Sequence, residues 1–96
     1  MFSRESAERT LVEVLNADYQ VDDDSLVIVP ELTIEQNYGW IFFYQSKKYL
    51  ETEVFSYRLA GNGPVVFEKE TGAVHHLGSH KHPDELIREF EAKRTK

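Results

Sequence analysis

Apolar residues recur along the chain with two different periods, which predict helices at both ends and strands between them. In Ser3–Asn16 they fall three or four positions apart, and one helix face would then carry Ala7, Leu11, Val14 and Leu15. Ser3 can cap this helix, and Glu5 lies in the first turn, where negative charge is favoured. A second helix is predicted over Pro83–Lys93, with an inward face formed by Leu86, Ile87 and Phe90.

Between the helices, apolar and polar residues alternate with the period of a β-strand. Leu26–Glu35 alternates throughout, and one side of this strand would carry Leu26, Ile28, Pro30, Leu32 and Ile34. Because Pro30 cannot donate to a ladder, we expect an edge strand or a strand broken by a bulge. A turn over Gln36–Gly39 leads to Trp40–Gln45, which is apolar on both faces. We expect this strand to be central in the sheet. Either both of its faces are covered, or one is covered and the other stays exposed as an apolar binding face.

A second hairpin follows a connection of different character. Lys47–Leu59 has only a weak helical stripe, which predicts an irregular or short helical crossover. Val65–Lys69 and Ala73–Leu77 are strands around a tight turn, in which we expect Gly72 to be left-handed. The prediction is an α+β fold: a four-stranded, mainly antiparallel sheet of two hairpins, packed with N- and C-terminal helices. One face of the sheet would receive both helices.

Composition indicates one folded domain over residues 1–96, because 41% hydrophobic and 29% charged residues are usual for a globular chain. The absence of cysteine excludes disulfides, cysteine-based metal sites and a thiol nucleophile. No apolar run approaches the roughly 20 residues of a membrane helix, and the first residues form no signal-peptide core. We therefore expect a cytoplasmic protein with no membrane partner.

The net charge of −6, from 17 acidic and 11 basic residues, bears on the partner. Basic residues are scattered except at Lys93–Lys96, whereas nucleic-acid binding needs clustered cations, so we expect no nucleic-acid partner. A basic protein is favoured instead, because opposite fields accelerate encounter. We expect a monomer or a weak homodimer, the latter through the strand edge that contains Pro30.

Four histidines are the first candidate for chemistry: His75, His76, His80 and His82. A metal site needs converging imidazoles, but His75 and His76 are neighbours on a predicted strand and point to opposite faces. No H-E-x-x-H spacing is present either. We therefore assign no metal ligand and no cofactor, and a histidine–metal enzyme remains only a third alternative. Its test is whether metal co-purifies with the chain and stabilises it.

Paired carboxylates are the second candidate. Glu51/Glu53, Glu68/Glu70 and Asp22–Asp24 could serve acid–base chemistry only in a cleft that moves a pKa toward neutrality. All lie in predicted turns or in the crossover, so we assign no catalytic residue. Acidic residues and tyrosines suit a protein-binding surface. The residues that we predict to contact a partner are Asp22, Asp23, Asp24, Glu35, Tyr38, Glu51, Glu53 and Tyr57.

Three strings in the second half resemble a known family. They are G-W-I-F-F-Y from Gly39, L-A-G-N-G-P from Leu59 and T-G-A-V-H-H-L-G from Thr71. In this order and spacing they are similar to the immunity protein 35 family, also called the YrhB-like domain, over roughly Gly39–Phe90. The N-terminal part resembles it only in pattern, so we expect divergence there. The motif residues that we interpret as specifying the fold are Trp40, Gly61, Asn62, Gly63, Gly72 and Gly78.

The resemblance implies a small α+β protein that is not an enzyme. Members are encoded beside polymorphic toxins in bacteria and are expected to neutralise the neighbouring toxin by binding it. We therefore expect a cognate toxin or effector as partner, bound stoichiometrically so that its active site is occluded. One branch of the family is described as chaperone-like. Holding unfolded clients on an apolar sheet face is thus an alternative, and the two apolar faces of Trp40–Tyr44 are its support.

Overall fold

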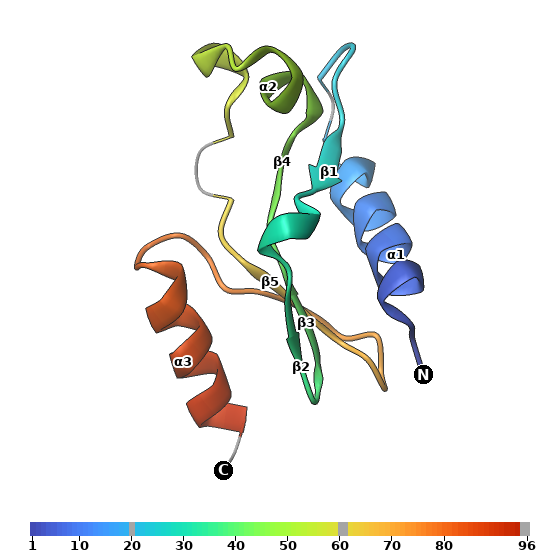
Figure 1. Ribbon diagram of the computed structural model, residues 1–96, viewed down its shortest axis with the longest axis vertical. Coiled ribbons are helices and arrows are strands. Elements are labelled where there is room, and N and C mark those ends of the chain that lie inside the picture. Colours follow the sequence, from blue (N-terminus) through green and yellow to red (C-terminus); the bar gives the residue numbers. More distant parts are fainter. Residues whose placement is uncertain (20, 60–61, 95–96) are drawn as a thin grey trace.

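The predicted α+β class is confirmed, but the strands form two antiparallel sheets (Figure 1). The computed structural model describes residues 1–19, 21–59 and 62–94. In chain order the elements are α1 (Arg4–Ala17), β1 (Leu26–Ile28), the 3-10 helix η1 (Pro30–Leu32), β2 (Ile34–Gln36), β3 (Gly39–Phe42), β4 (Tyr44–Ser46), α2 (Lys47–Thr52), the 3-10 helix η2 (Phe55–Tyr57), β5 (Val65–Glu68), β6 (Val74–His76) and α3 (Pro83–Arg94). The four-stranded sheet has the order β2-β3-β5-β6, and β1 pairs with β4 in a second sheet.

The first predicted strand is broken where the proline falls. Between the β1–β4 and β2–β3 pairings, the first strand holds three more residues than its partner. Pro30–Leu32 takes up this excess as η1, since proline has no N–H to donate to a ladder. The prediction that the apolar side of this strand continues to Ile34 is therefore wrong beyond Ile28. Leu32 is 54% exposed, and Ile34 is also exposed.

Each face of the larger sheet is covered by a different helix (Figure 1). One core joins α1 to the strands and contains Ala7, Leu11, Leu15, Leu26, Trp40, Phe42, Val65 and Phe67. The other joins α3 to the opposite face and contains Ile41, Val66 and Ile87, with Phe43 and Phe90 partly buried beside them. The prediction that one face receives both helices is therefore wrong. Because β3 and β5 are apolar on both faces, each face needs its own cover.

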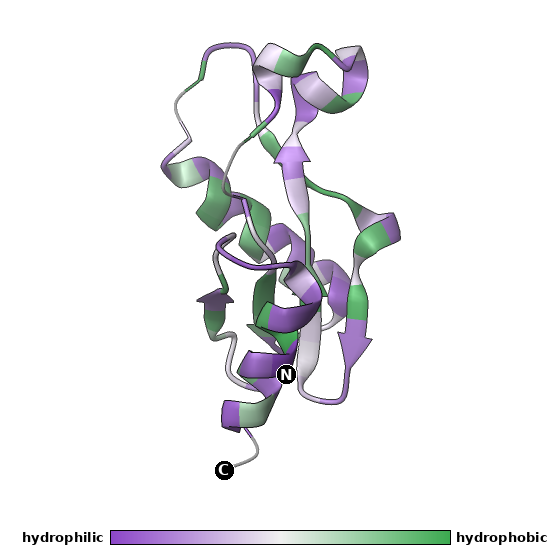
Figure 2. Cartoon of the chain, turned by 90° about the vertical axis from the view of Figure 1, so that its left-hand side faces the viewer, coloured by the Kyte–Doolittle hydropathy of each residue, from purple (hydrophilic) through white to green (hydrophobic). Residues whose placement is uncertain are grey.

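The two long helices have the amphipathic character that the period predicts, since each buries residues of one stripe and exposes the rest. Figure 2 shows α3 on the side nearest the viewer, with hydrophilic and hydrophobic bands along it. The capping role of Ser3 is confirmed, because its hydroxyl accepts a hydrogen bond from the Ser6 N–H while the Ser6 hydroxyl accepts one from the Ser3 N–H. The prediction that Val14 lies on the buried face of this helix is wrong, because Val14 is exposed. The buried face of α1 is narrow and consists of Ala7, Leu11 and Leu15.

Glycine is required around the second hairpin for two different reasons. Gly72 has a φ of 77°, which confirms the predicted left-handed conformation. Gly63 lies against the backbone of Gly78, and a Cβ added to it would meet the Gly78 carbonyl oxygen at 1.5 Å. Among the motif residues, Gly61 lies outside the described part of the chain, as do the last two residues of the basic tail. No helix in residues 1–19, 21–59 or 62–94 is long and apolar enough to cross a bilayer.

The two-sided core makes a direct prediction about stability. Phe67 is fully buried and contacts the rings of Phe2 and Trp40. We expect Phe67→Ala to lower the free energy of unfolding by about 3–5 kcal/mol, measured by urea denaturation. The matched control is Phe55→Ala, which removes a ring that is 77% exposed and should change stability by less than about 0.5 kcal/mol. Equal losses in the two variants would contradict this assignment of the core.

Candidate partner-binding surface

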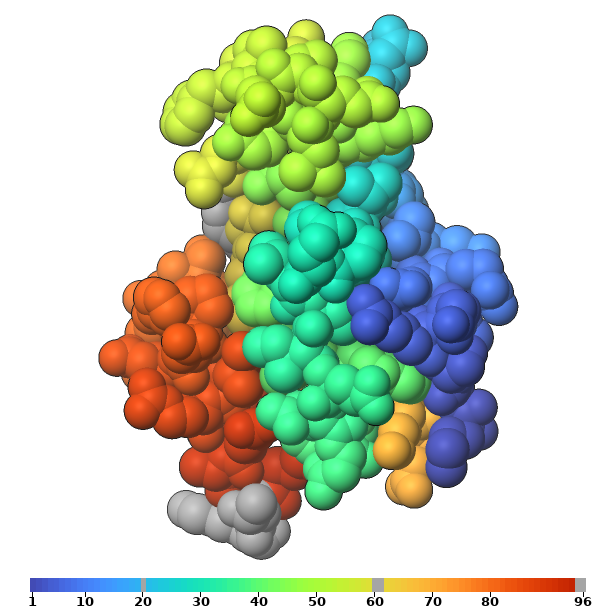
Figure 3. All heavy atoms as spheres, in the orientation of Figure 1, coloured from blue at the N-terminus to red at the C-terminus, as the bar shows by residue number. Residues whose placement is uncertain are grey.

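The chain between β4 and β5 forms a projection at one end of the long axis. We use the name projection for residues 47–58, which comprise α2, η2 and the turn between them. Every residue from 50 to 58 is exposed. In the space-filling view this segment is a rounded knob that stands clear of both long helices (Figure 3). The short helical crossover predicted here is confirmed, and its surface is available to another molecule.

The projection carries four apolar side chains that are wholly or partly exposed to water. Phe55 is 77% exposed, and three further residues are also exposed: Leu50, Val54 and Tyr57. Burying a side chain of this kind is worth about 1.5–3 kcal/mol, so leaving Phe55 in water forgoes that stabilisation. Sequence reasoning selected Tyr57 and missed the other three. Leu50 and Val54 belong to the weak helical stripe, and nothing in its period distinguishes an exposed stripe from a buried one.

Asp24 fixes the start of the projection. Its carboxylate accepts four hydrogen bonds, from the hydroxyls of Tyr19 (2.8 Å) and Ser46 (2.6 Å) and the N–H groups of Ser25 (2.8 Å) and Lys48 (3.0 Å). Burial raises the pKa of Asp24, but the hydrogen bonds outweigh it and lower the pKa to about 2. Ser46 also caps α2 by accepting a hydrogen bond from the Tyr49 N–H. The carboxylate thus stays ionised and joins the loop before β1 to the first turn of α2.

Two side-chain amides fix the end of the projection. The Gln45 Oε1 atom accepts a hydrogen bond of 2.8 Å from the Leu59 N–H. Asn62 donates from Nδ2 to the Tyr44 carbonyl oxygen at 2.7 Å. The returning chain is therefore held against β4, and both ends of the projection are anchored to the small β1–β4 sheet.

Within the projection, the turn from α2 into η2 passes through an unusual conformation. Glu53 has a φ of 56°, in the left-handed region, and its N–H donates to the Tyr49 carbonyl oxygen at 2.7 Å. A non-glycine residue held there costs about 1–3 kcal/mol. Glycine is the usual residue at such a helix end. The local geometry of the projection is thus maintained at some cost to stability.

The structure brings together part of the predicted contact set. Asp22 and Asp23 lie in the loop before β1, which reaches the same end of the molecule as the projection (Figure 1). Glu51, Glu53 and Tyr57 lie in the projection itself. Two predicted residues are elsewhere, in β2 and the turn after it at the opposite end: Glu35 and Tyr38. Asp24 has the intramolecular role described above, and its contact with a partner stays a prediction.

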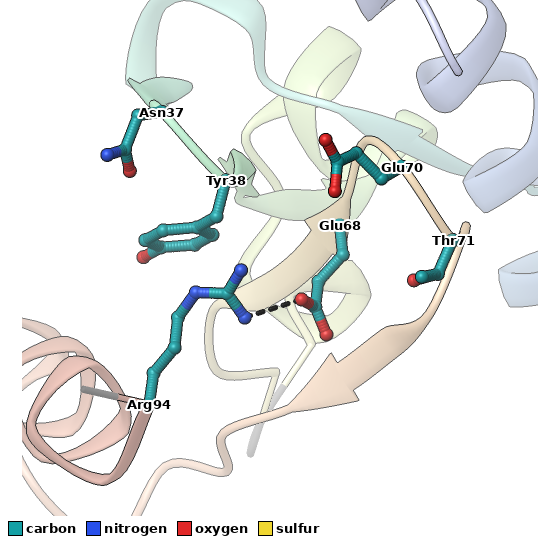
Figure 4. A pocket seen from close by; sticks show the side chains of 6 residues that line it. All are labelled: Asn37, Tyr38, Glu68, Glu70, Thr71 and Arg94. Atoms are coloured by element: carbon teal, nitrogen blue, oxygen red, sulfur yellow. Dashed lines mark hydrogen bonds and ion pairs between the residues drawn. The ribbon is translucent and has the colours of Figure 1, made fainter. Parts of the chain in front are cut away.

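A polar pocket of about 240 Å³ lies beside the β2–β3 turn, away from the projection (Figure 4). It is lined by Asn37, Tyr38, Glu68, Glu70, Thr71 and Arg94. Arg94 donates to Glu68 Oε1 at 2.5 Å, and His75 Nε2 donates to Glu68 Oε2 at 2.7 Å. These hydrogen bonds, that of His75 above all, lower the pKa of Glu68 although burial raises it. An acid–base catalyst needs a pKa near neutrality, so this environment shifts the carboxyl in the wrong direction.

The same pocket has a structural explanation. The Tyr38 hydroxyl donates to Glu91 Oε2 at 2.8 Å, and the Arg94 guanidinium lies 4.5 Å from the centre of the Tyr38 ring. Burial and the Glu91 carboxylate raise the pKa of Tyr38 far above its ordinary value. These contacts join the last turns of α3 to the sheet. Among the described residues, no three histidine or carboxylate side chains are grouped so that they could hold a metal ion.

The fold and the surface together define a small α+β protein with an anchored projection, on which Phe55 and three other apolar side chains are exposed. The chain belongs to the immunity protein 35 family, whose model matches residues 5–90. It is 35% identical over 79 residues to the uncharacterized protein YrhB of Escherichia coli (strain K12), and the alignment covers 82% of this chain and 84% of that protein. No solved structure matches it significantly. The family resemblance is confirmed, and the match extends to α1.

The hydrogen bonds of Asp24 predict a pH-dependent contribution to stability. We expect Asp24→Ala to lower the free energy of unfolding at pH 7 by at least about 1.5 kcal/mol, because hydrogen bonds to charged groups contribute about 1.5–3 kcal/mol. The folded-state pKa of Asp24 lies below its ordinary value, so this contribution is complete above the ordinary pKa and is lost as the pH falls toward about 2.

Urea denaturation of both proteins between about pH 7 and pH 2 measures the difference in stability. That difference should narrow on acidification. Asp22→Ala, at an exposed neighbour for which no hydrogen bond is described, is the control and should match the parent protein throughout. A difference for Asp24→Ala that is independent of pH would contradict the role assigned to its charge.

Proposed function

We propose that this protein is an immunity protein of a polymorphic toxin system, which binds a cognate secreted toxin in the cytoplasm of the producing cell. Neutralisation is stoichiometric, by occlusion of the toxin's active site. The observation that carries the proposal is the anchored projection with its exposed apolar side chains, in a chain that belongs to an immunity protein family. Large apolar side chains left in water on a fixed scaffold are typical of a protein-binding surface.

Binding, not catalysis, is the activity that we assign. The polar pocket beside the β2–β3 turn contains a carboxyl group, that of Glu68, whose pKa is lowered and which pairs with Arg94 and His75. The projection presents no comparable set of reactive groups in a cleft. The protein therefore acts by contact, and the proposal requires neither a metal nor a cofactor.

Charge supports a basic partner. The chain has a net charge of −6. Four of the acidic side chains at the projection end take part in none of the ion pairs found in the described residues: Asp22, Asp23, Glu51 and Glu53. Lys47, Lys48 and Arg58 also lie in the projection, so it is the negative charge of the chain as a whole that favours encounter with a positively charged partner.

The chaperone alternative loses the feature that supported it. It rested on a sheet face left open by the apolar residues of Trp40–Tyr44. In the structure Trp40 and Phe42 are buried under α1, while Ile41 and Phe43 pack on the α3 side. The larger sheet thus has no open apolar face for unfolded clients.

The direct test uses the purified product of the neighbouring gene. We expect a one-to-one complex with a dissociation constant below about 10 nM by titration calorimetry, as suits a dedicated inhibitor. Inhibition of that product's activity should be complete at equimolar protein. An absence of binding, together with weak binding to many heat-unfolded proteins, would contradict the immunity function and restore the chaperone alternative.

A charge reversal tests electrostatic steering by the projection. The double variant Glu51→Lys, Glu53→Lys should associate more slowly with the same product, and its association rate should depend less on salt. The control reverses two exposed glutamates elsewhere, Glu13→Lys with Glu70→Lys, and so changes the net charge equally. Equal slowing in both variants would assign steering to the overall charge, and an unchanged rate in both would refute steering.

A further inference from the structure

We propose that the projection inserts into a concave, apolar-lined cleft of the partner protein, with the Phe55 ring as its anchor. This inference rests on the proposed function and adds the mode of contact, because it names the inserted element and the shape of the surface that receives it. It concerns Phe55, Leu50 and Val54, which the sequence analysis did not select.

Shape is the first argument. Residues 50 to 58 form an unbroken run of nine exposed residues on a knob at one end of the molecule (Figure 3). A flat partner surface would touch only one side of such a knob. A standard flat interface uses about 20–30 residues a side, which the projection cannot supply. A cleft surrounds the knob, so most of its surface is buried and a few residues suffice.

The Phe55 side chain is the second argument. It is the most exposed large apolar side chain in the described chain apart from Met1, and it lies at the start of η2 with Val54 directly before it. Anchors that carry most of a binding energy are usually large side chains that fill a desolvated pocket on the partner. An aromatic ring also gains much contact area while losing few rotamers.

Rigidity is the third argument. The hydrogen bonds of Asp24, Gln45 and Asn62 hold both ends of the projection against the β1–β4 sheet. Lys48 Nζ also lies 5.1 Å from the centre of the Tyr57 ring, which joins α2 to η2. A segment that is already ordered loses little conformational entropy when it binds. The left-handed Glu53 fits this description, because backbone strain is commonly retained where a surface is functional.

A second copy of this chain is a poorer occupant. Two convex projections touch over a small area, well below the roughly 800 Å² per partner of a stable interface. An apolar partner cleft encloses the knob and buries more of its surface, and it is the occupant to which the proposal commits. We expect groups of both charges at its rim, because the projection carries Lys47, Lys48 and Arg58 besides its two glutamates.

The test measures the affinity of single variants for the purified product of the neighbouring gene. We expect Phe55→Ala to raise the dissociation constant by about 30-fold or more, chiefly through faster dissociation, as for a central anchor. The matched control is Leu32→Ala, which removes another exposed apolar side chain, 54% exposed, from η1 outside the projection. It should change the constant less than about threefold, as expected outside the contact surface.

A second variant reports insertion itself. In Phe55→Trp the new indole lies in water in the free protein, whereas Trp40 is buried. Binding in a cleft should shift the fluorescence emission to shorter wavelength. Complex formation without that shift would contradict insertion, even if affinity is retained.

The outcomes separate this inference from the proposed function. If the unmodified protein does not bind the neighbouring product, both are overturned. If it binds and Phe55→Ala binds within about threefold of it, the insertion mode alone is overturned. If the protein instead forms a concentration-dependent dimer that Phe55→Ala abolishes, the occupant is a second copy and the proposed cleft is wrong.

Discussion

Burial of β3 and β5 on both faces is the constraint on which the rest of the structure depends. The four residues of β3 are buried, and in β5 three of four are buried. A strand of this kind stabilises the fold only if both faces are covered, so α1 is committed to one face and α3 to the other. α1 also covers β1 of the smaller sheet, where Leu26 joins the same core. The apolar residues of the projection have no sheet face left to pack against, which is why they remain in water.

The break at Pro30 determines where the projection stands. The three extra residues of η1 separate the long hairpin into two sheets, and the smaller β1–β4 sheet rises away from the larger one (Figure 1). This small sheet carries the anchoring groups, since Asp24 precedes β1 while Gln45 belongs to β4. A proline in one strand thus separates the small β1–β4 sheet from the larger one, and polar contacts on this small sheet hold the projection in place. The structural and the proposed functional features share one origin in the sequence.

Much of this fold could be predicted from the sequence, because each secondary structure has its own hydrophobic period. The helix over residues 4–17, its Ser3 cap, the turn at Gly72 and the two-sided apolar strand all follow from local patterns. Which face each helix covers could not be predicted, because both faces of the central strand are equally apolar.

The surface was harder to predict for two physical reasons. The acidic run before β1 consists of three consecutive aspartates, which the sequence alone does not distinguish. Only tertiary contacts with Tyr19, Ser46 and Lys48 give the third of them, Asp24, a structural role. An exposed phenylalanine is also indistinguishable from a buried one until the positions of its possible neighbours are known. The three sequence strings that begin at Gly39, Leu59 and Thr71 identified the family correctly. They lie outside the projection, and one of them contains Asn62, which bonds to the Tyr44 carbonyl oxygen.

The central claim is that the projection is where a partner binds, and amide hydrogen exchange tests it most directly. Exchange would be followed by mass spectrometry for the protein alone and in complex with the product of its neighbouring gene. We expect slower exchange on binding in residues 47–58 and in the adjoining loop before β1, with α1 and α3 unchanged. Protection confined to α1, α3 or the β2 edge, with the projection exchanging as in the free protein, would contradict the claim.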